Sequence, residues 1–196
     1  MKLSNKFTLS RLVLAPVFLL IYFIPIWTGN FGALSMIIGI PLLVFMEFTD
    51  YLDGHYARKH NEVSDFGKLF DPFADVMVHL TTFLCFMFSA GGNGYMKPVI
   101  FALILYREMS MNFLRMIAAK QGTAIAARPG GKFKTVMYVA SGFFALFLET
   151  LTRFGAEPEF FGGLRIASLV MFCICLLCSY ASFADYLIHF GKLIKE

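Results

Sequence analysis

The chain has 196 residues, of which 58% are hydrophobic and 15% are charged, and its mean hydropathy is +0.69. An average soluble domain carries about 25% charged residues, so this composition excludes an ordinary soluble globular protein and indicates an integral membrane protein. The net charge of +4 does not indicate nucleic-acid binding, because the basic residues are not interleaved with aromatic residues in a soluble patch.

Six apolar runs are long enough to cross a bilayer, which takes about 20 helical residues. In chain order, we predict transmembrane helices over residues 9–28, 31–52, 66–90, 98–119, 133–152 and 163–190. The segments between them are short and either polar or rich in glycine, as is typical of turns. We therefore expect an all-α integral membrane bundle of six transmembrane helices, forming a single domain over residues 1–196.

The basic residues are distributed unevenly around these runs. If the N-terminus is cytoplasmic, twelve lysines and arginines lie on the cytoplasmic side, and only Lys97, Arg153 and Arg165 lie on the other. Cytoplasmic segments of membrane proteins carry such an excess of positive charge. We therefore predict that both termini are cytoplasmic.

Four aspartates, Asp50, Asp53, Asp71 and Asp75, stand at the ends of the second and third apolar runs. Carboxylates in such places are costly unless they hold a cation or take part in chemistry. On helices, the spacing of three residues in the first pair and of four in the second puts each pair on one face. Two adjacent antiparallel helices would then present all four carboxylates toward each other.

The residue types around these aspartates favour a site for a nucleotide diphosphate. Oxygen ligands without histidine or thiolate suit a hard cation such as Mg²⁺ or Mn²⁺. Gly54, Ala57 and Gly67 lie on the same helical stripes and would let an extended ligand approach the backbone. Arg58 supplies a planar, positively charged group that can bind phosphate.

Simpler interpretations of the acidic residues remain open at this point. Intramembrane acids can form a proton or ion path, or pair with Arg107 and Arg115 in the fourth run. A non-enzymatic ion carrier of this kind would need neither Gly54 nor Ala57.

The pattern Asp50-x2-Asp53-Gly54-x2-Ala57-Arg58-x8-Gly67-x3-Asp71-x3-Asp75 resembles the signature of the CDP-alcohol phosphotransferases at every specified position. Segments 5–11, 106–108, 114–122, 125–127 and 131–135 resemble the members of this family that use glycerol 3-phosphate. The resemblance implies transfer of the phosphatidyl group of CDP-diacylglycerol to sn-glycerol 3-phosphate, with release of CMP. Val76 stands where many of those members carry a lysine, so an enzyme using inositol phosphate, serine or choline is the alternative.

The family resemblance also implies roles for individual residues. Asp50, Asp53 and Asp71 would bind a divalent metal ion, and Asp71 and Asp75 would share a second one, either Mg²⁺ or Mn²⁺. Asp75 is the expected general base, which takes the proton of the acceptor hydroxyl. The residues expected to bind CDP-diacylglycerol are Asn5, Thr8, Gly54, Ala57, Arg58 and Gly67.

The acceptor phosphate is expected to bind a group of cations. Arg107 and Arg115 are costly within a membrane unless they are paired or face water, and with Lys132 and Lys134 they could bracket a dianion. The alternative for Arg107 is a salt bridge with Glu108 or Glu149. His79, one turn beyond Asp75, is expected to be a buried structural histidine, with a supporting place beside the aspartates as the alternative.

The resemblance further implies a homodimer whose partners are the two substrates and membrane lipid. We expect the chain in a bacterial cytoplasmic membrane, with its active site facing the cytoplasm, because no transit peptide precedes the first apolar run.

Overall fold

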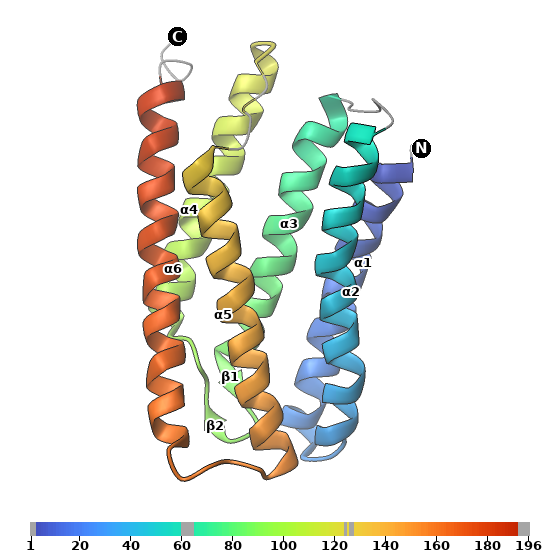
Figure 1. The fold of residues 1–196 in the computed structure, drawn as a ribbon, viewed down its shortest axis with the longest axis vertical. Helices are drawn as coiled ribbons and strands as arrows, with labels where there is room; N and C mark the ends of the chain where they lie inside the picture. The colour runs from blue at the N-terminus through green and yellow to red at the C-terminus, as the bar shows by residue number, and fades with distance from the viewer. Residues whose placement is uncertain (1–2, 60–64, 124, 126–127, 192–196) are drawn as a thin grey trace.

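The computed structural model describes residues 3–59, 65–123, 125 and 128–191, and within these ranges it describes the side chains except at residues 3–5, 51–59, 65, 66 and 68. The described part of the chain forms six α-helices and one short β-hairpin (Figure 1). The helices are α1 (Leu3–Thr28), α2 (Gly32–Lys59), α3 (Asp65–Phe86), α4 (Pro98–Lys120), α5 (Pro129–Phe154) and α6 (Phe161–Phe190), and the strands are β1 (Phe88–Ser89) and β2 (Gly92–Asn93). The predicted all-α class is thereby confirmed.

Five of these helices, α1, α2, α3, α5 and α6, are long and apolar enough to cross a membrane within the described residues. Helix α4 has the length, but Arg107, Glu108 and Arg115 interrupt its apolar sequence. The sixth predicted crossing therefore stays a prediction.

The connection between α3 and α4 differs from the expected one. The third helix ends at Phe86, four residues earlier than predicted, and an antiparallel hairpin pairs Phe88 with Asn93. The chain then turns so tightly that a Cβ atom at Gly94 would lie 2.0 Å from the carbonyl oxygen of Met87. Only glycine fits there, so the glycine-rich sequence specifies this turn.

The second predicted connection also begins later than expected, because α2 continues to Lys59 instead of ending near residue 52. Gly54, Ala57 and Arg58 are therefore helical residues, whereas the predicted break began at residue 54. Because α2 continues, the first half of the pattern, from Asp50 to Arg58, lies entirely on the last turns of this helix.

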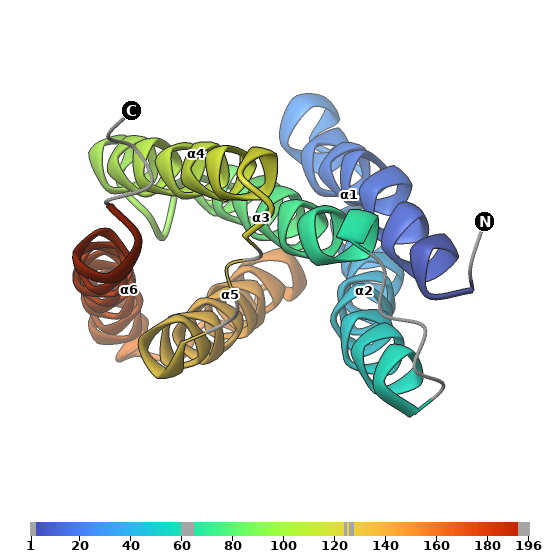
Figure 2. The same ribbon diagram turned by 90° about the horizontal axis from the view of Figure 1, so that it is seen from above.

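Helix α3 lies in the middle of the bundle, with α1 and α2 on one side and α4, α5 and α6 on the other (Figure 2). Helix α1 packs along both α2 and α3, whereas α2 and α3 touch each other only sparsely. Helices α2 and α3 therefore meet only over a short stretch, which includes Glu47 and His79, while α1 packs along both. The first turn of α1, the last turns of α2 and the first turn of α3 lie at one end of the bundle (Figure 1).

Candidate functional site

An arginine of α1 lies between the aspartates of α2 and α3. The Nη1 atom of Arg11 donates to Oδ1 of Asp50 at 2.5 Å and also to Oδ1 of Asp75. The Arg11 side chain is 2% exposed, while those of Asp50 and Asp75 are 42% and 31% exposed. One buried cation thus joins carboxylates from two helices, and the carboxylates remain open to the surroundings.

A second contact repeats this arrangement one turn away. Thr8, one turn before Arg11 on α1, donates from Oγ1 to Oδ1 of Asp71 at 2.7 Å. Asp71 lies one turn before Asp75 on α3, so two neighbouring turns of α1 contact two neighbouring turns of α3. The structure therefore brings together three of the four predicted aspartates.

The other predicted residues of this region lie beside the same end of the bundle. Gly67 is buried in the first turn of α3. The side chains of Asn5, Asp53, Ala57 and Arg58 lie outside the described residues, although all four positions, like Gly54, belong to helices.

The donor chemistry of Asp50, Asp71 and Asp75 fits a hard divalent cation. All three supply carboxylate oxygens, which Mg²⁺ and Mn²⁺ prefer, and the oxygens of Asp50 and Asp75 are close enough to contact one atom. In the part of the chain that is described, no three acidic, histidine or cysteine side chains already surround a common point. The guanidinium of Arg11 stands where the carboxylates of Asp50 and Asp75 converge.

A small cleft, with a volume of about 10 Å³, lies beside these carboxylates. It is lined by Arg11, Met46, Glu47, Asp50, Asp75, Val78 and His79. Glu47 lies one turn before Asp50 on α2, and His79 lies one turn after Asp75 on α3. Their atoms Oε1 and Nε2 are 3.8 Å apart.

Beyond His79, two of the predicted acceptor cations share one buried carboxylate. Glu108 accepts from Nη1 of Arg107 at 2.8 Å, from Nζ of Lys134 at 2.8 Å and from the hydroxyl of Tyr138 at 3.0 Å. Arg107 also donates from Nε to the backbone oxygen of Ser179 at 2.9 Å. We call these five residues the Glu108 cluster. The expected alternative for Arg107, a salt bridge with Glu108, is what the structure shows.

The remaining predicted cations lie outside this cluster. Arg115 is half-buried, and Arg107 and Glu108 are within its electrostatic range. Lys132 is exposed, because it lies two positions from the buried Lys134 and so points to the opposite side of α5. The four cations therefore do not form one group.

Tyr138 connects the cleft with the Glu108 cluster. Its ring is 5.6 Å from the ring of His79 between centroids, in an edge-to-face arrangement. The Nζ atom of Lys134 lies 4.5 Å from the centre of the same ring. The carboxylates, the cleft and the buried cations thus follow one another across the interior of the bundle.

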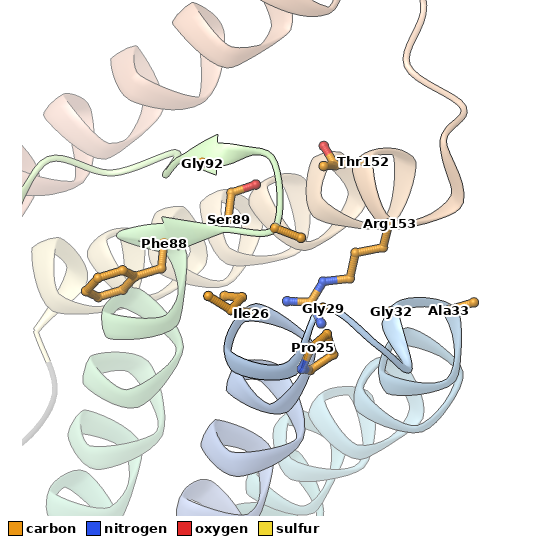
Figure 3. Close-up of a pocket in the computed structure, with 11 residues that line it drawn as sticks. Pro25, Ile26, Gly29, Gly32, Ala33, Phe88, Ser89, Gly92, Thr152 and Arg153 are labelled. Carbon is orange, nitrogen blue, oxygen red and sulfur yellow. The ribbon is translucent and has the colours of Figure 1, made fainter.

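A larger cavity, of about 600 Å³, lies at the opposite end of the bundle, between the ends of α1 and α5 and the β-hairpin (Figure 3). Its polar wall is Arg153, which donates to Glu149 at 2.7 Å, to Ser35 at 2.6 Å and to the backbone oxygen of Tyr22 at 2.9 Å. Burial and the charge of Glu149 raise the pKa of Tyr95 to about 12, so Tyr95 stays protonated and donates to Glu149. These contacts fasten the hairpin to α1, α2 and α5.

Two residues of the site were not predicted from the sequence. In the sequence, Arg11 contributes to the excess of cytoplasmic basic residues and nothing more specific is predicted for it. The available signal was that Arg11 ends segment 5–11, which resembles the family, and follows Thr8 by one helical turn. Glu47 precedes Asp50 by three residues, so its position on the same helical stripe was the available signal.

Known proteins resemble this chain over most of its length. The profile of the CDP-alcohol phosphatidyltransferase family matches residues 1–178. A CDP-diacylglycerol–glycerol-3-phosphate 3-phosphatidyltransferase of Treponema pallidum is 36% identical over 203 residues, covering 100% of this chain and 92% of the relative. Relatives with the same name are 33% identical in Bacillus subtilis, covering 68% of this chain and 70% of that protein, and 29% identical in Aquifex aeolicus, covering 99% and 98%.

Proposed function

The chain belongs to the CDP-alcohol phosphatidyltransferase family, and from this premise we propose that it transfers the phosphatidyl group of CDP-diacylglycerol to sn-glycerol 3-phosphate. The products are phosphatidylglycerophosphate and CMP. The names of the relatives support this choice of substrates. The observation that carries the proposal is the convergence of Asp50, Asp71 and Asp75 on α1, next to a cluster of buried cations.

The donor has acyl chains that stay in the bilayer and a nucleotide that is soluble in water, so its site must lie at a membrane boundary. The aspartates meet that demand, because they belong to the C-terminal part of α2 and the N-terminal part of α3, and these ends of the two helices lie at one end of the bundle (Figure 1). We propose that all six helices cross a bacterial cytoplasmic membrane and that this end, with both termini, faces the cytoplasm. The excess of basic residues at this end supports the orientation. The family resemblance supports a homodimer.

Two divalent ions, Mg²⁺ or Mn²⁺, would be held here, one by Asp50, Asp53 and Asp71 and a second shared by Asp71 and Asp75. When bound, they would neutralise the pyrophosphate of the donor and the charge that develops on the attacking and departing oxygens. Asp75 accepts the proton of the acceptor hydroxyl as that oxygen attacks the phosphorus on the lipid side.

The rest of the donor is bound by the small and polar residues around the aspartates. Gly54, Ala57 and Gly67 leave room for the cytidine and the phosphates, and Arg58 pairs with a phosphate. Asn5 and Thr8, in the first two turns of α1, would also contact the donor. The contact of Thr8 with Asp71 supports this role for Thr8.

The acceptor phosphate is bound near Arg107 and Lys134. These two cations face one carboxylate, Glu108, so the Glu108 cluster keeps one positive charge in excess. Arg115 adds another charge nearby. An excess of positive charge inside a membrane protein favours a dianionic phosphate, which serine and choline do not carry.

The direct test is incorporation of radiolabelled glycerol 3-phosphate into lipid by the purified chain in CDP-diacylglycerol micelles, with Mg²⁺ or with EDTA. We expect labelled lipid and an equal amount of CMP with Mg²⁺, and neither with EDTA. Inositol phosphate, serine and choline should release little CMP. Release of CMP with one of these acceptors instead would identify a sibling enzyme, and the absence of any CMP release would contradict an enzymatic function.

A further inference from the structure

A buried histidine faces the cleft without a hydrogen-bond partner for one of its ring nitrogens. His79 is 7% exposed, and within the described part of the chain its Nε2 atom makes no hydrogen bond. Glu47 is the nearest acidic group, but the 3.8 Å between its Oε1 and Nε2 of His79 exceeds hydrogen-bond length. A buried polar atom without a partner is costly, so a ligand hydroxyl that paired with Nε2 of His79 would be stabilised there.

The gap between these two atoms suits a hydroxyl group. One hydroxyl oxygen can lie at an ordinary hydrogen-bond distance of about 2.8 Å from both atoms. A hydroxyl both donates and accepts, so it can donate to a carboxylate oxygen and at the same time accept from Nε2 of the imidazole when that nitrogen carries the proton.

The position of the pair indicates which hydroxyl this is. Glu47 and His79 lie one helical turn inside Asp50 and Asp75, on the wall of the same cleft. On its other side, His79 contacts the ring of Tyr138. The Nζ atom of Lys134 lies over the same ring. The pair therefore stands between the carboxylates and the Glu108 cluster.

The proposed acceptor, glycerol 3-phosphate, carries its groups along its three carbons in the same order as the carboxylates, the cleft and the Glu108 cluster follow one another in the protein. Its reacting hydroxyl is on C1, its phosphate is on C3, and a second hydroxyl is on C2. If the C1 hydroxyl lies at Asp75 and the phosphate at the Glu108 cluster, the C2 hydroxyl falls in the cleft between them.

We propose that His79 and Glu47 bind the C2 hydroxyl of the acceptor, and thereby select a phosphorylated diol over a phosphorylated alcohol with a single hydroxyl. This inference rests on the proposed function, because it assumes that glycerol 3-phosphate is the acceptor. A site built to pair with a hydroxyl rejects the analogue that lacks it, since the buried polar groups then stay unpaired.

The test compares glycerol 3-phosphate with 3-hydroxypropyl phosphate, which has the same length and phosphate but no C2 hydroxyl. The full chain, reconstituted with CDP-diacylglycerol and Mg²⁺, is assayed for kcat/KM with each acceptor. The wild type should prefer glycerol 3-phosphate by about 10- to 100-fold, the effect of one hydrogen bond to a charged or buried group. In His79→Ala this preference should fall to less than about threefold, through a loss confined to glycerol 3-phosphate.

Three further variants separate recognition from folding. Glu47→Gln keeps its size and should lower the preference partly, while His79→Gln, which retains a donor and an acceptor, should restore part of it. His189→Ala is the matched control, because the side chain of His189 is 45% exposed in the last turn of α6 and does not line the cleft. This substitution should leave the preference unchanged. The apparent KM for CDP-diacylglycerol should stay at the wild-type value in all four variants.

Each contrary outcome has a separate meaning. Equal losses with both acceptors in His79→Ala and Glu47→Gln would overturn the inference, because a structural pair would not distinguish the acceptors. A wild type that uses the two acceptors equally would also overturn it, while leaving the proposed function intact. Failure of the wild type to use glycerol 3-phosphate at all would count against the proposed function itself.

Discussion

The substitution Glu108→Gln tests the buried cluster that we assign to the acceptor phosphate. The carboxylate of Glu108 uses both oxygens: Oε1 accepts from Lys134 and Tyr138, and Oε2 accepts from Arg107. A glutamine amide has only one oxygen. If that oxygen keeps Lys134 and Tyr138, the amide NH₂ group faces the guanidinium of Arg107, and two donors meet.

The expected loss of stability follows from these contacts. One charge-assisted hydrogen bond disappears, which is worth about 1.5–3 kcal/mol. In addition, the excess charge of the Glu108 cluster rises from one positive charge to two, in a place where Arg107 is 3% exposed and Lys134 is 8% exposed. Breaking a buried ion pair from one side costs about 3–5 kcal/mol in total. We expect the free energy of unfolding to fall by that amount.

The measurement is equilibrium unfolding by denaturant in mixed micelles of detergent and lipid. Glu159→Gln is the matched control, because Glu159 is exposed in the connection before α6 and its substitution should leave stability unchanged. A loss below about 1 kcal/mol for Glu108→Gln would refute the reasoning, because it would mean that water or another anion already compensates the two cations.

Three other substitutions give further tests. Arg11→Met should lower the unfolding temperature in EDTA, because the carboxylates of Asp50 and Asp75 then face each other without a cation. Mg²⁺ should restore the unfolding temperature, since an ion that binds only the native state stabilises that state. Equal losses with and without Mg²⁺ would contradict a shared cation site. Asp75→Asn should reduce CMP release to background while gel filtration still shows folded protein, and retained transfer would rule out Asp75 as the base. Glu149→Gln should lower the free energy of unfolding by about 3 kcal/mol, because it leaves the buried Arg153 without its counter-ion. Transfer per folded molecule should not change in Glu149→Gln, since this pair lies at the opposite end from Asp75, and a selective loss of transfer would show that the two ends are coupled.

The helices themselves could be predicted from the sequence, because hydrophobic periodicity and helix-ending residues act over a few neighbouring positions. Asp71 and Asp75, four residues apart, share a face of α3 whatever the rest of the fold does. Oxygen-only side chains likewise define a hard-cation site without any knowledge of packing. The ends of helices were less predictable, as α2 shows by continuing past Gly54 into polar sequence.

The partners of the charged side chains were decided by tertiary packing. Arg11 meets Asp50 and Asp75 across 39 and 64 residues of sequence, and no local pattern specifies that α1 lies along both α2 and α3. Lys134 and Lys132 look equivalent in the sequence, yet only Lys134 reaches Glu108 of α4. Burial is the physical reason: a charge taken out of water must find its counter-charge in whichever helix lies beside it, and only the packed bundle determines which helix that is.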